Sequence, residues 1–113
     1  MSSGGDLNQF SEKRRYKRCA IDARAVVIHR GQYLNEIAVD VSEGGMRVRV
    51  LKPYEIGETI EVCFFLGNGA FIEEVGEVAY SYVGDDGERY IGVRYPKPSR
   101  TNQTLIRQFV EAN

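Results

Sequence analysis

The feature that most constrains the fold is a series of short segments in which apolar and polar residues alternate. In segment 46–50 the apolar side chains fall on one face, and Arg47 and Arg49 fall on the other. Segment 60–66 alternates in the same way. Alternation with a period of two is typical of a β-strand that buries one face, whereas a helix repeats every 3.6 residues. The chain is therefore predicted to be built mainly from strands.

Turn residues separate these segments. Asn68-Gly69 is a hairpin signal, and segment 84–87 (Gly-Asp-Asp-Gly) is another. Further strands are predicted at 25–28, 35–41, 71–83 and 89–95. Gly76 is interpreted as a bend or bulge. About six strands with no helix between them predict a mainly all-β fold, an antiparallel barrel or sandwich, because a parallel sheet would need long crossover connections.

The pattern changes after Pro98, where apolar residues recur at helical spacing. Ser99 or Thr101 is suited to cap a helix, which we expect at about 101–112. Its apolar stripe consists of Leu105, Ile106, Phe109 and Val110. We expect this helix to pack on the strands and close one end of the fold. The alternative is that it shifts on ligand binding or presents a face to a partner.

Composition is typical of one globular domain. A chain of 113 residues with 42% hydrophobic and 27% charged residues fits a single domain, which we place at 12–113 after a flexible tail at 1–11. Apolar runs are far shorter than the roughly 20 residues of a membrane span, and no secretory signal pattern follows the start. We therefore expect a cytoplasmic protein with no membrane insertion.

Residue types that carry catalysis or bind metals are sparse. Cys19 and Cys63 are far apart and match no metal or redox spacing, so reduced thiols are expected. His29 is the one histidine and is expected at the end of a strand. Because the sequence offers no metal-ligand set and no base beside a nucleophile, we expect no metal, no cofactor and no enzymatic activity.

Basic charge is concentrated at one point of the chain. Lys13, Arg14, Arg15, Lys17 and Arg18 make up a third of the fifteen basic residues, and sixteen acidic residues bring the net charge to −1. A protein that binds a long nucleic acid usually spreads basic residues over a face. A compact cluster in an otherwise acidic chain suits a small dianion better. The alternative is a solvated basic tail.

Segment 40–45 (Asp-Val-Ser-Glu-Gly-Gly) offers groups that complement this cluster. An arginine fork suits phosphate or the N7 and O6 atoms of guanine. The carboxylate of Asp40 accepts hydrogen bonds, and the Watson–Crick edge of guanine carries donors. The two segments together therefore have the residue types needed to hold a guanine nucleotide. Taken alone, segment 40–45 is also explained as a turn in which Asp40 and Ser42 bond the backbone.

These residues carry a family resemblance. The pattern RRxxR followed by DxSxxG, here Arg14, Arg15, Arg18, Asp40, Ser42 and Gly45, resembles the signature of the PilZ domain. Segment 90–95 is similar to a late strand of the same family. The resemblance implies an antiparallel β-barrel of about six strands with a C-terminal helix, acting as a non-catalytic bacterial receptor for the second messenger cyclic di-GMP.

The resemblance also implies roles for single residues. Arg14 and Arg18 would hold phosphate and guanine, with Arg15 assisting, and Asp40 and Ser42 would read a guanine edge. The arginine segment precedes the first predicted strand, so ligand binding would order it.

Three further residues are assigned around the turn. Gly45 would allow the turn, and Gly44 would let the backbone approach the ligand or adopt a positive φ. Arg47 lies close enough in sequence to touch the ligand. Whether one ligand or a stacked pair binds stays open.

The output of such a receptor is expected to be contact with an unidentified effector protein in motility, pili, exopolysaccharide or virulence, and the chain itself is expected to be a monomer or homodimer. One alternative is a PilZ-like adaptor that works through protein contacts without binding nucleotide. A barrel that binds single-stranded nucleic acid is disfavoured by the acidic remainder of the chain. Tyr33, Tyr54, Tyr80, Tyr82 and Tyr90 are interpreted as strand residues rather than as a base-stacking platform.

Overall fold

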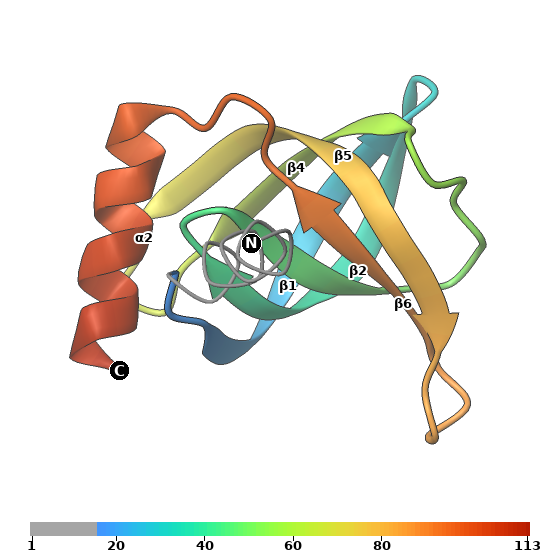
Figure 1. Cartoon of the computed structure of the whole chain (residues 1–113), viewed down its shortest axis with the longest axis horizontal. Helices are drawn as coiled ribbons and strands as arrows, with labels where there is room; N and C mark the ends of the chain where they lie inside the picture. The colour runs from blue at the N-terminus through green and yellow to red at the C-terminus, as the bar shows by residue number, and fades with distance from the viewer. Residues whose placement is uncertain (1–15) are drawn as a thin grey trace, which may run out of the picture.

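The computed structural model describes residues 16–113, which form six strands and one helix (Figure 1). The elements are β1 Cys19–His29, β2 Gln32–Ser42, β3 Gly45–Val50, β4 Thr59–Phe65, β5 Phe71–Val83, β6 Arg89–Arg94 and α2 Arg100–Ala112. The predicted tail at 1–11, together with Arg14 and Arg15, lies outside the described residues.

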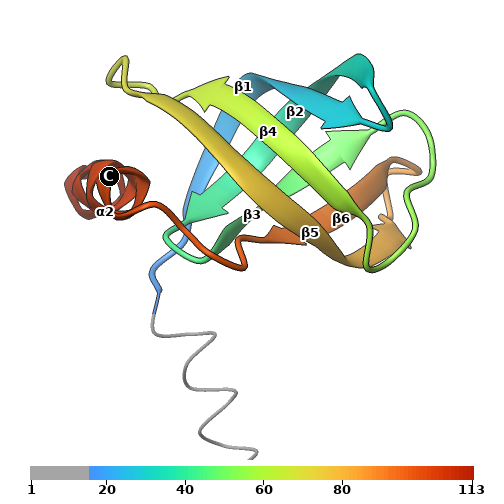
Figure 2. The same ribbon diagram turned by 90° about the horizontal axis from the view of Figure 1, so that it is seen from above.

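All strand pairs are antiparallel, and the strand order β1-β2-β3-β6-β5-β4 closes on itself. Short turns join four neighbouring pairs. Two pairings, β3 with β6 and β4 with β1, join segments that are distant in the sequence. Figure 2 shows the strands wrapping around a common centre. The predicted antiparallel β-barrel with a C-terminal helix is confirmed.

The core lies inside this barrel and follows the alternation seen in the sequence. Met46, Val48 and Val50 are buried, as are Ile60, Val62, Phe64 and Leu66, while Arg47 and Arg49 lie on the outer face. Full burial of one such side chain contributes about 1.5–3 kcal/mol relative to exposure, so a one-residue slip of a strand would be strongly disfavoured.

Helix α2 covers one end of the barrel, as Figures 1 and 2 both show. It begins after Ser99, whose hydroxyl accepts a hydrogen bond from the backbone N–H of Asn102 at 3.2 Å. Ile106, Phe109 and Val110 are buried against the barrel. The helix therefore packs on the strands, and it starts one residue before the predicted range.

Two strands each contain an extra residue that reverses the alternation. In β2, Val39 has no partner on β3, and in β5, Ala79 has no partner on β6. Beyond each of these β-bulges the next side chain points outward instead of inward. The bulge predicted at Gly76 is wrong, because Gly76 pairs regularly with Ile60. A Cβ atom at Gly76 would overlap a Val93 side-chain carbon, so this glycine permits close packing instead.

Candidate functional site

Asp40 is the centre of a charged cluster on the outer face of the barrel. The bulge at Val39 turns Asp40 outward, where it lies opposite Arg47 on β3. Its Oδ2 atom is 3.1 Å from Nε of Arg47, and its Oδ1 atom is 3.3 Å from Nη1 of Arg18. The structure thus brings together three of the predicted site residues, one of them from the arginine motif.

This cluster has more donors than acceptors. Arg47 also donates from Nη1 to the hydroxyl of Tyr82 at 2.6 Å, and this bond raises the pKa of Arg47 above its ordinary value. The Nε atom of Arg47 is buried and, among the described residues, has no hydrogen-bond partner, since its contact with Asp40 is an ion pair without hydrogen-bond alignment. Arg18 is half exposed. Two guanidinium groups share one carboxylate, so some of their N–H donors remain able to bind an anion.

Ser42 is committed to the turn between β2 and β3. Its hydroxyl donates to the carbonyl of Gly45 and accepts from the backbone N–H of Gly44, each at 3.3 Å, and the residue is buried. The alternative stated for this segment, a side chain that bonds the backbone of a turn, therefore describes Ser42 in the structure. Asp40 instead projects from the strand.

The two glycines of this turn lie close to neighbouring segments, and the positive φ given as one alternative for Gly44 is not found. Neither Gly44 nor Gly45 has a positive φ. A Cβ atom at Gly45 would overlap the backbone carbonyl oxygen of Val93, and one at Gly44 would lie 2.9 Å from Cδ2 of Tyr16. Glycine is required at position 45 because the backbone of β6 approaches the turn closely, whereas the contact at Gly44 is with the side chain of Tyr16.

The same turn is linked to the C-terminal helix. Arg107 of α2 pairs with Glu43 through two contacts, Nη2 to Oε1 at 3.0 Å and Nε to Oε2 at 3.2 Å. The carboxylate raises the pKa of Arg107. Tyr16, which belongs to the arginine segment, lies against Gly44 beside this pair. Tyr16, the turn and α2 therefore meet at one place.

The sequence interpretation missed a ladder of tyrosines beside Arg47. Tyr80, Tyr82 and Tyr90 are strand residues, as expected, but their rings also stack, with centroids 6.0 Å and 5.2 Å apart along the series. The Arg47 guanidinium carbon lies 5.6 Å from the centroid of the Tyr90 ring. The available sequence signal was the spacing of two residues between Tyr80 and Tyr82, because residues two apart on a strand lie on the same face. Tyr54 was wrongly placed on a strand, since it lies in the loop between β3 and β4.

A model of the PilZ domain matches residues 12–112 of this sequence. The chain belongs to the PilZ domain family. The match covers both motifs and continues through α2. A comparison with curated protein sequences finds no match.

Solved structures resemble this PilZ chain in fold. The inhibitor of motility of Bacillus subtilis has a TM-score of 0.80 at 16% identity, over 88% of this chain and 50% of that one. YcgR from Escherichia coli in complex with cyclic di-GMP has a TM-score of 0.77 at 15% identity, over 88% and 45%. The isolated PilZ domain of YcgR from Escherichia coli with cyclic di-GMP has a TM-score of 0.70 at 14% identity, over 88% of this chain and 90% of that one. The chain thus spans about half the length of the first two proteins.

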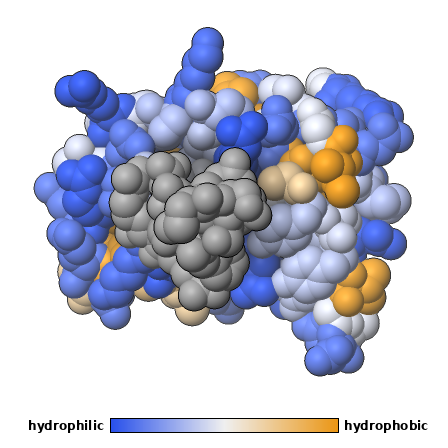
Figure 3. All heavy atoms as spheres, viewed as in Figure 1, coloured by the Kyte–Doolittle hydropathy of each residue, from blue (hydrophilic) through white to orange (hydrophobic). Residues whose placement is uncertain are grey.

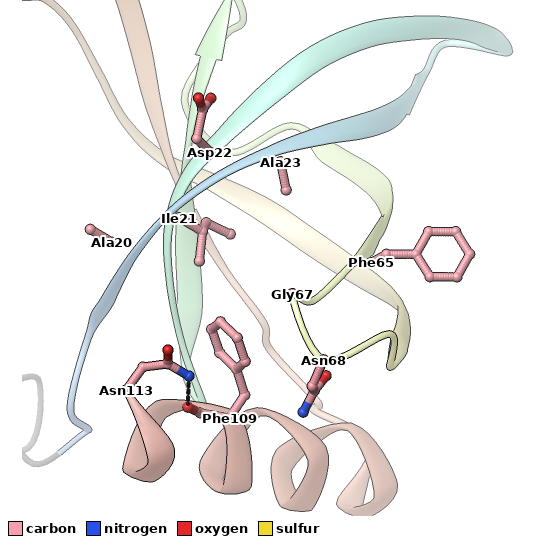
Figure 4. Close-up of a pocket in the computed structure, with 9 residues that line it drawn as sticks. All are labelled: Ala20, Ile21, Asp22, Ala23, Phe65, Gly67, Asn68, Phe109 and Asn113. Carbon is pink, nitrogen blue, oxygen red and sulfur yellow. Dashed lines mark hydrogen bonds between the residues drawn. The ribbon is translucent and has the colours of Figure 1, made fainter.

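A hollow in this PilZ chain lies away from the charged cluster. It has a volume of about 460 Å³ and is lined by Ala20–Ala23 of β1, the turn after β4, and the end of α2 (Figure 4). The ring of Phe109 points into it, and Asn113 bonds the carbonyl of Phe109 beside it. None of the predicted site residues lines this hollow.

Residues 16–113 lack two kinds of feature, a metal-binding cluster and a helix suited to cross a membrane. This part of the chain contains no group of three His, Cys, Asp or Glu side chains placed to hold a metal ion. Within the same residues, no helix has both the length and the apolar character needed to cross a membrane.

Proposed function

We propose that this chain is a non-catalytic receptor for cyclic di-GMP that relays the signal through protein contacts. The observation that carries the proposal is the position of Asp40, held on the outer face of the barrel between Arg18 of one motif and Arg47 of the next strand. Membership of the PilZ family and the cyclic di-GMP complexes of two structural neighbours support it.

The cluster has the chemistry that this ligand needs. Cyclic di-GMP carries two phosphates, which suit arginine forks, and two guanines, whose donor edge suits a carboxylate. In the proposal Arg14, Arg15 and Arg18 bind phosphate and guanine, and Asp40 accepts from a guanine edge. Ser42, Gly44 and Gly45 then act by shaping the turn that presents Asp40, because the hydroxyl of Ser42 is already used within the turn.

The surrounding surface fits a polar ligand. Figure 3 shows that the visible part of this face is mostly hydrophilic, with isolated hydrophobic residues rather than a continuous apolar area. Each charge-assisted hydrogen bond contributes roughly 1.5–3 kcal/mol. Four or five of them, reduced by the cost of ordering both partners, give an expected dissociation constant on the order of micromolar.

The contact of the turn with α2 offers a path for the signal. Ligand binding at Arg18 and Asp40 would act on Glu43, three residues from Asp40, and through it on Arg107 of the helix. The effector would then recognise the changed position of α2 or of the arginine segment. The effector itself is unidentified, and the family resemblance alone implies that it belongs to machinery for motility, pili, exopolysaccharide or virulence.

Isothermal titration calorimetry with cyclic di-GMP tests the proposal. Arg18→Ala and Asp40→Asn should each lose binding by about 100-fold or more, whereas Arg30→Ala should bind as the parent chain does. Arg30 is a matched control because it also pairs with a carboxylate, that of Glu58, but lies in the turn between β1 and β2, at the opposite end of β2 from Asp40. GTP should not compete at equal concentration.

The same titration gives the stoichiometry, one ligand or a stacked pair. Absence of heat and of thermal stabilisation at saturating cyclic di-GMP would reject the receptor function. The protein would then be better described as a PilZ adaptor that acts through protein contacts alone.

A further inference from the structure

Strand β1 is paired much further along one side than along the other. On the β2 side its pairs run from Cys19 to His29, whereas on the β4 side they cover only residues 25–28. Over segment 19–24 the second edge of β1 therefore has no strand partner within the described part of the chain. An unpaired strand edge presents N–H and C=O groups that can pair with another extended chain.

Two local features leave this edge uncovered. Ile21 and Asp22 together lie opposite the single residue Val39 of β2, which makes a β-bulge in β1. A bulge bends its strand and increases the local twist, so β1 diverges from its neighbour here. On the other side, β4 ends at Phe65 and the chain turns back into β5, so β4 does not continue along segment 19–24.

The hollow of about 460 Å³ lies along this unpaired edge. Ala20–Ala23 of β1 form one wall, and the turn after β4 and the end of α2 form the others (Figure 4). Its volume is within the range of roughly 300–1,000 Å³ that is usual for binding sites. Segment 19–24 is about 20 Å long at roughly 3.3 Å per residue. A recess of this shape suits one extended chain better than the broad face of a second barrel.

The walls of the hollow define the chemistry of an occupant. Ile21 and the ring of Phe109 supply apolar surface. Asp22 is exposed, and its carboxylate forms no ion pair within residues 16–113. Among the same residues, no lysine or arginine lines the hollow. A complementary segment therefore carries an apolar side chain for the hollow and a basic side chain for Asp22.

We propose that β1 binds an extended segment of a partner protein along residues 19–24 as an added strand, with an apolar side chain of that segment in the hollow and a basic one beside Asp22. In strand addition the main-chain hydrogen bonds give affinity, and pockets for alternate side chains give specificity. The inference rests on the proposed function in treating this partner as the effector. The ligand cluster is adjacent, because Ala20 pairs with Asp40 across the other edge of β1.

Panning a random seven-residue peptide library on the full chain, without cyclic di-GMP, tests the proposal. The enriched peptides should share alternating apolar residues and a lysine or arginine. Fluorescence anisotropy then measures the most enriched peptide on variants of the chain. Asp22→Lys should weaken its binding by about 10-fold or more, and Asp85→Lys should leave it within about two-fold. Asp85 is a matched control, because it is an exposed aspartate in the turn between β5 and β6.

Backbone methylation of that peptide distinguishes strand addition from binding through side chains alone. Only alternate N–H groups of an added strand face β1. Methylation of one alternate set of peptide nitrogens should therefore abolish binding, whereas methylation of the other set should leave it within about three-fold. The unmethylated peptide should also slow hydrogen exchange of alternate amides in segment 19–24 by about 10-fold or more.

Each contrary outcome overturns the proposal. Absence of enriched peptides, equal binding to Asp22→Lys, or equal loss with both methylated peptides would show that the edge does not accept a strand. Full protection of segment 19–24 in the free chain would mean that the chain covers this edge itself. A dimer that Asp22→Lys dissociates in sedimentation would mean that a second copy covers it.

The two proposals fail separately. Peptide binding is measured without cyclic di-GMP, and the calorimetry of cyclic di-GMP is measured without peptide. If the chain binds the peptide but not cyclic di-GMP, the added strand stands and the receptor function is rejected. If the chain binds cyclic di-GMP but no peptide, the receptor function stands and the added strand is wrong.

Discussion

Two clusters of charged and polar side chains lie at different places on the barrel, and they differ in how open they are. The open cluster joins Asp40 to Arg18 and Arg47 on the outer face of the strands. The closed cluster joins the loop between β3 and β4 to β1, β2 and the turn between them, and this loop lies at the end of the barrel away from α2 (Figure 1). Its contacts are His29 with Glu58 at 2.7 Å, Arg30 with Glu58 at 3.0 Å, and Tyr54 with Glu36 at 2.9 Å.

The clusters differ in how completely their groups are satisfied. In the closed cluster Glu36 is buried and accepts from both Tyr54 and the backbone N–H of Leu51. Burial raises the pKa of Glu36 and of Tyr54. In the open cluster the buried Nε atom of Arg47 has no hydrogen bond among the described residues. A closed polar cluster holds a loop in place, whereas an open one keeps donors available for a ligand.

The turn of the open cluster should be the most sensitive to substitution. Gly45→Ala places a Cβ atom against the carbonyl oxygen of Val93 and should destabilise the chain by about 2 kcal/mol or more. Gly67→Ala is the control, because its Cβ atom would meet Phe109 at an ordinary 3.5 Å. Urea unfolding of both variants measures this. Equal stability of the two would show that close approach does not define the turn.

Removal of one tyrosine hydroxyl should affect stability differently in the two clusters. Tyr54→Phe leaves the buried carboxylate of Glu36 with one donor fewer and should cost about 1–2 kcal/mol of stability without changing ligand affinity. Tyr82→Phe frees a half-exposed Arg47 and should change stability by less than about 0.5 kcal/mol. Chemical unfolding and calorimetry of both variants test this. A larger loss of stability in Tyr82→Phe than in Tyr54→Phe would contradict the distinction between the closed and the open cluster.

The closed cluster should govern the response to acid. Hydrogen bonds from the backbone of Glu55 and from His29 lower the pKa of Glu58 from 4.5 to about 2 in the folded chain. Its contribution to stability is therefore present above the unfolded pKa of 4.5 and is lost as the pH falls toward 2. In Glu58→Gln the free energy of unfolding should vary less across that range.

Thermal unfolding between about pH 5 and 2, a range that includes the window between those two pKa values, checks this prediction. Glu55→Gln is the control, since it changes an exposed carboxylate of the same loop and keeps the backbone donor. Identical acid profiles for Glu58→Gln and the parent chain would rule out this role of the closed cluster.

The smallest effect on stability is expected at the link between the turn and α2. Arg107 is exposed, so Arg107→Gln should leave the thermal midpoint unchanged within error, as is usual for an exposed ion pair. It should nevertheless reduce any ligand-induced change in hydrogen exchange of α2. An undiminished change in α2 would show that the signal does not pass through Glu43.

Much of the barrel was predictable because strand alternation is a local property. Segment 46–50 and segment 60–66 bury the residues that their period predicted, and the stripe on α2 does the same. Asp40, Ser42 and Gly45 were found as a motif. The motif did not show that Ser42 would be consumed by the turn, or that Gly45 serves a contact with β6, because both depend on strands that meet only in the barrel.

The residue types, their alternation and the two motifs are properties of the sequence by itself, and they determined the strands, the terminal helix and the family. The tertiary structure alone decided which side chains of different strands share a face. Val39 and Ala79 become bulges only through pairing with β3 and β6, and this pairing turns Asp40 and Tyr80 outward. Alternation is set within a strand, whereas register is set by packing between strands that are far apart in the chain.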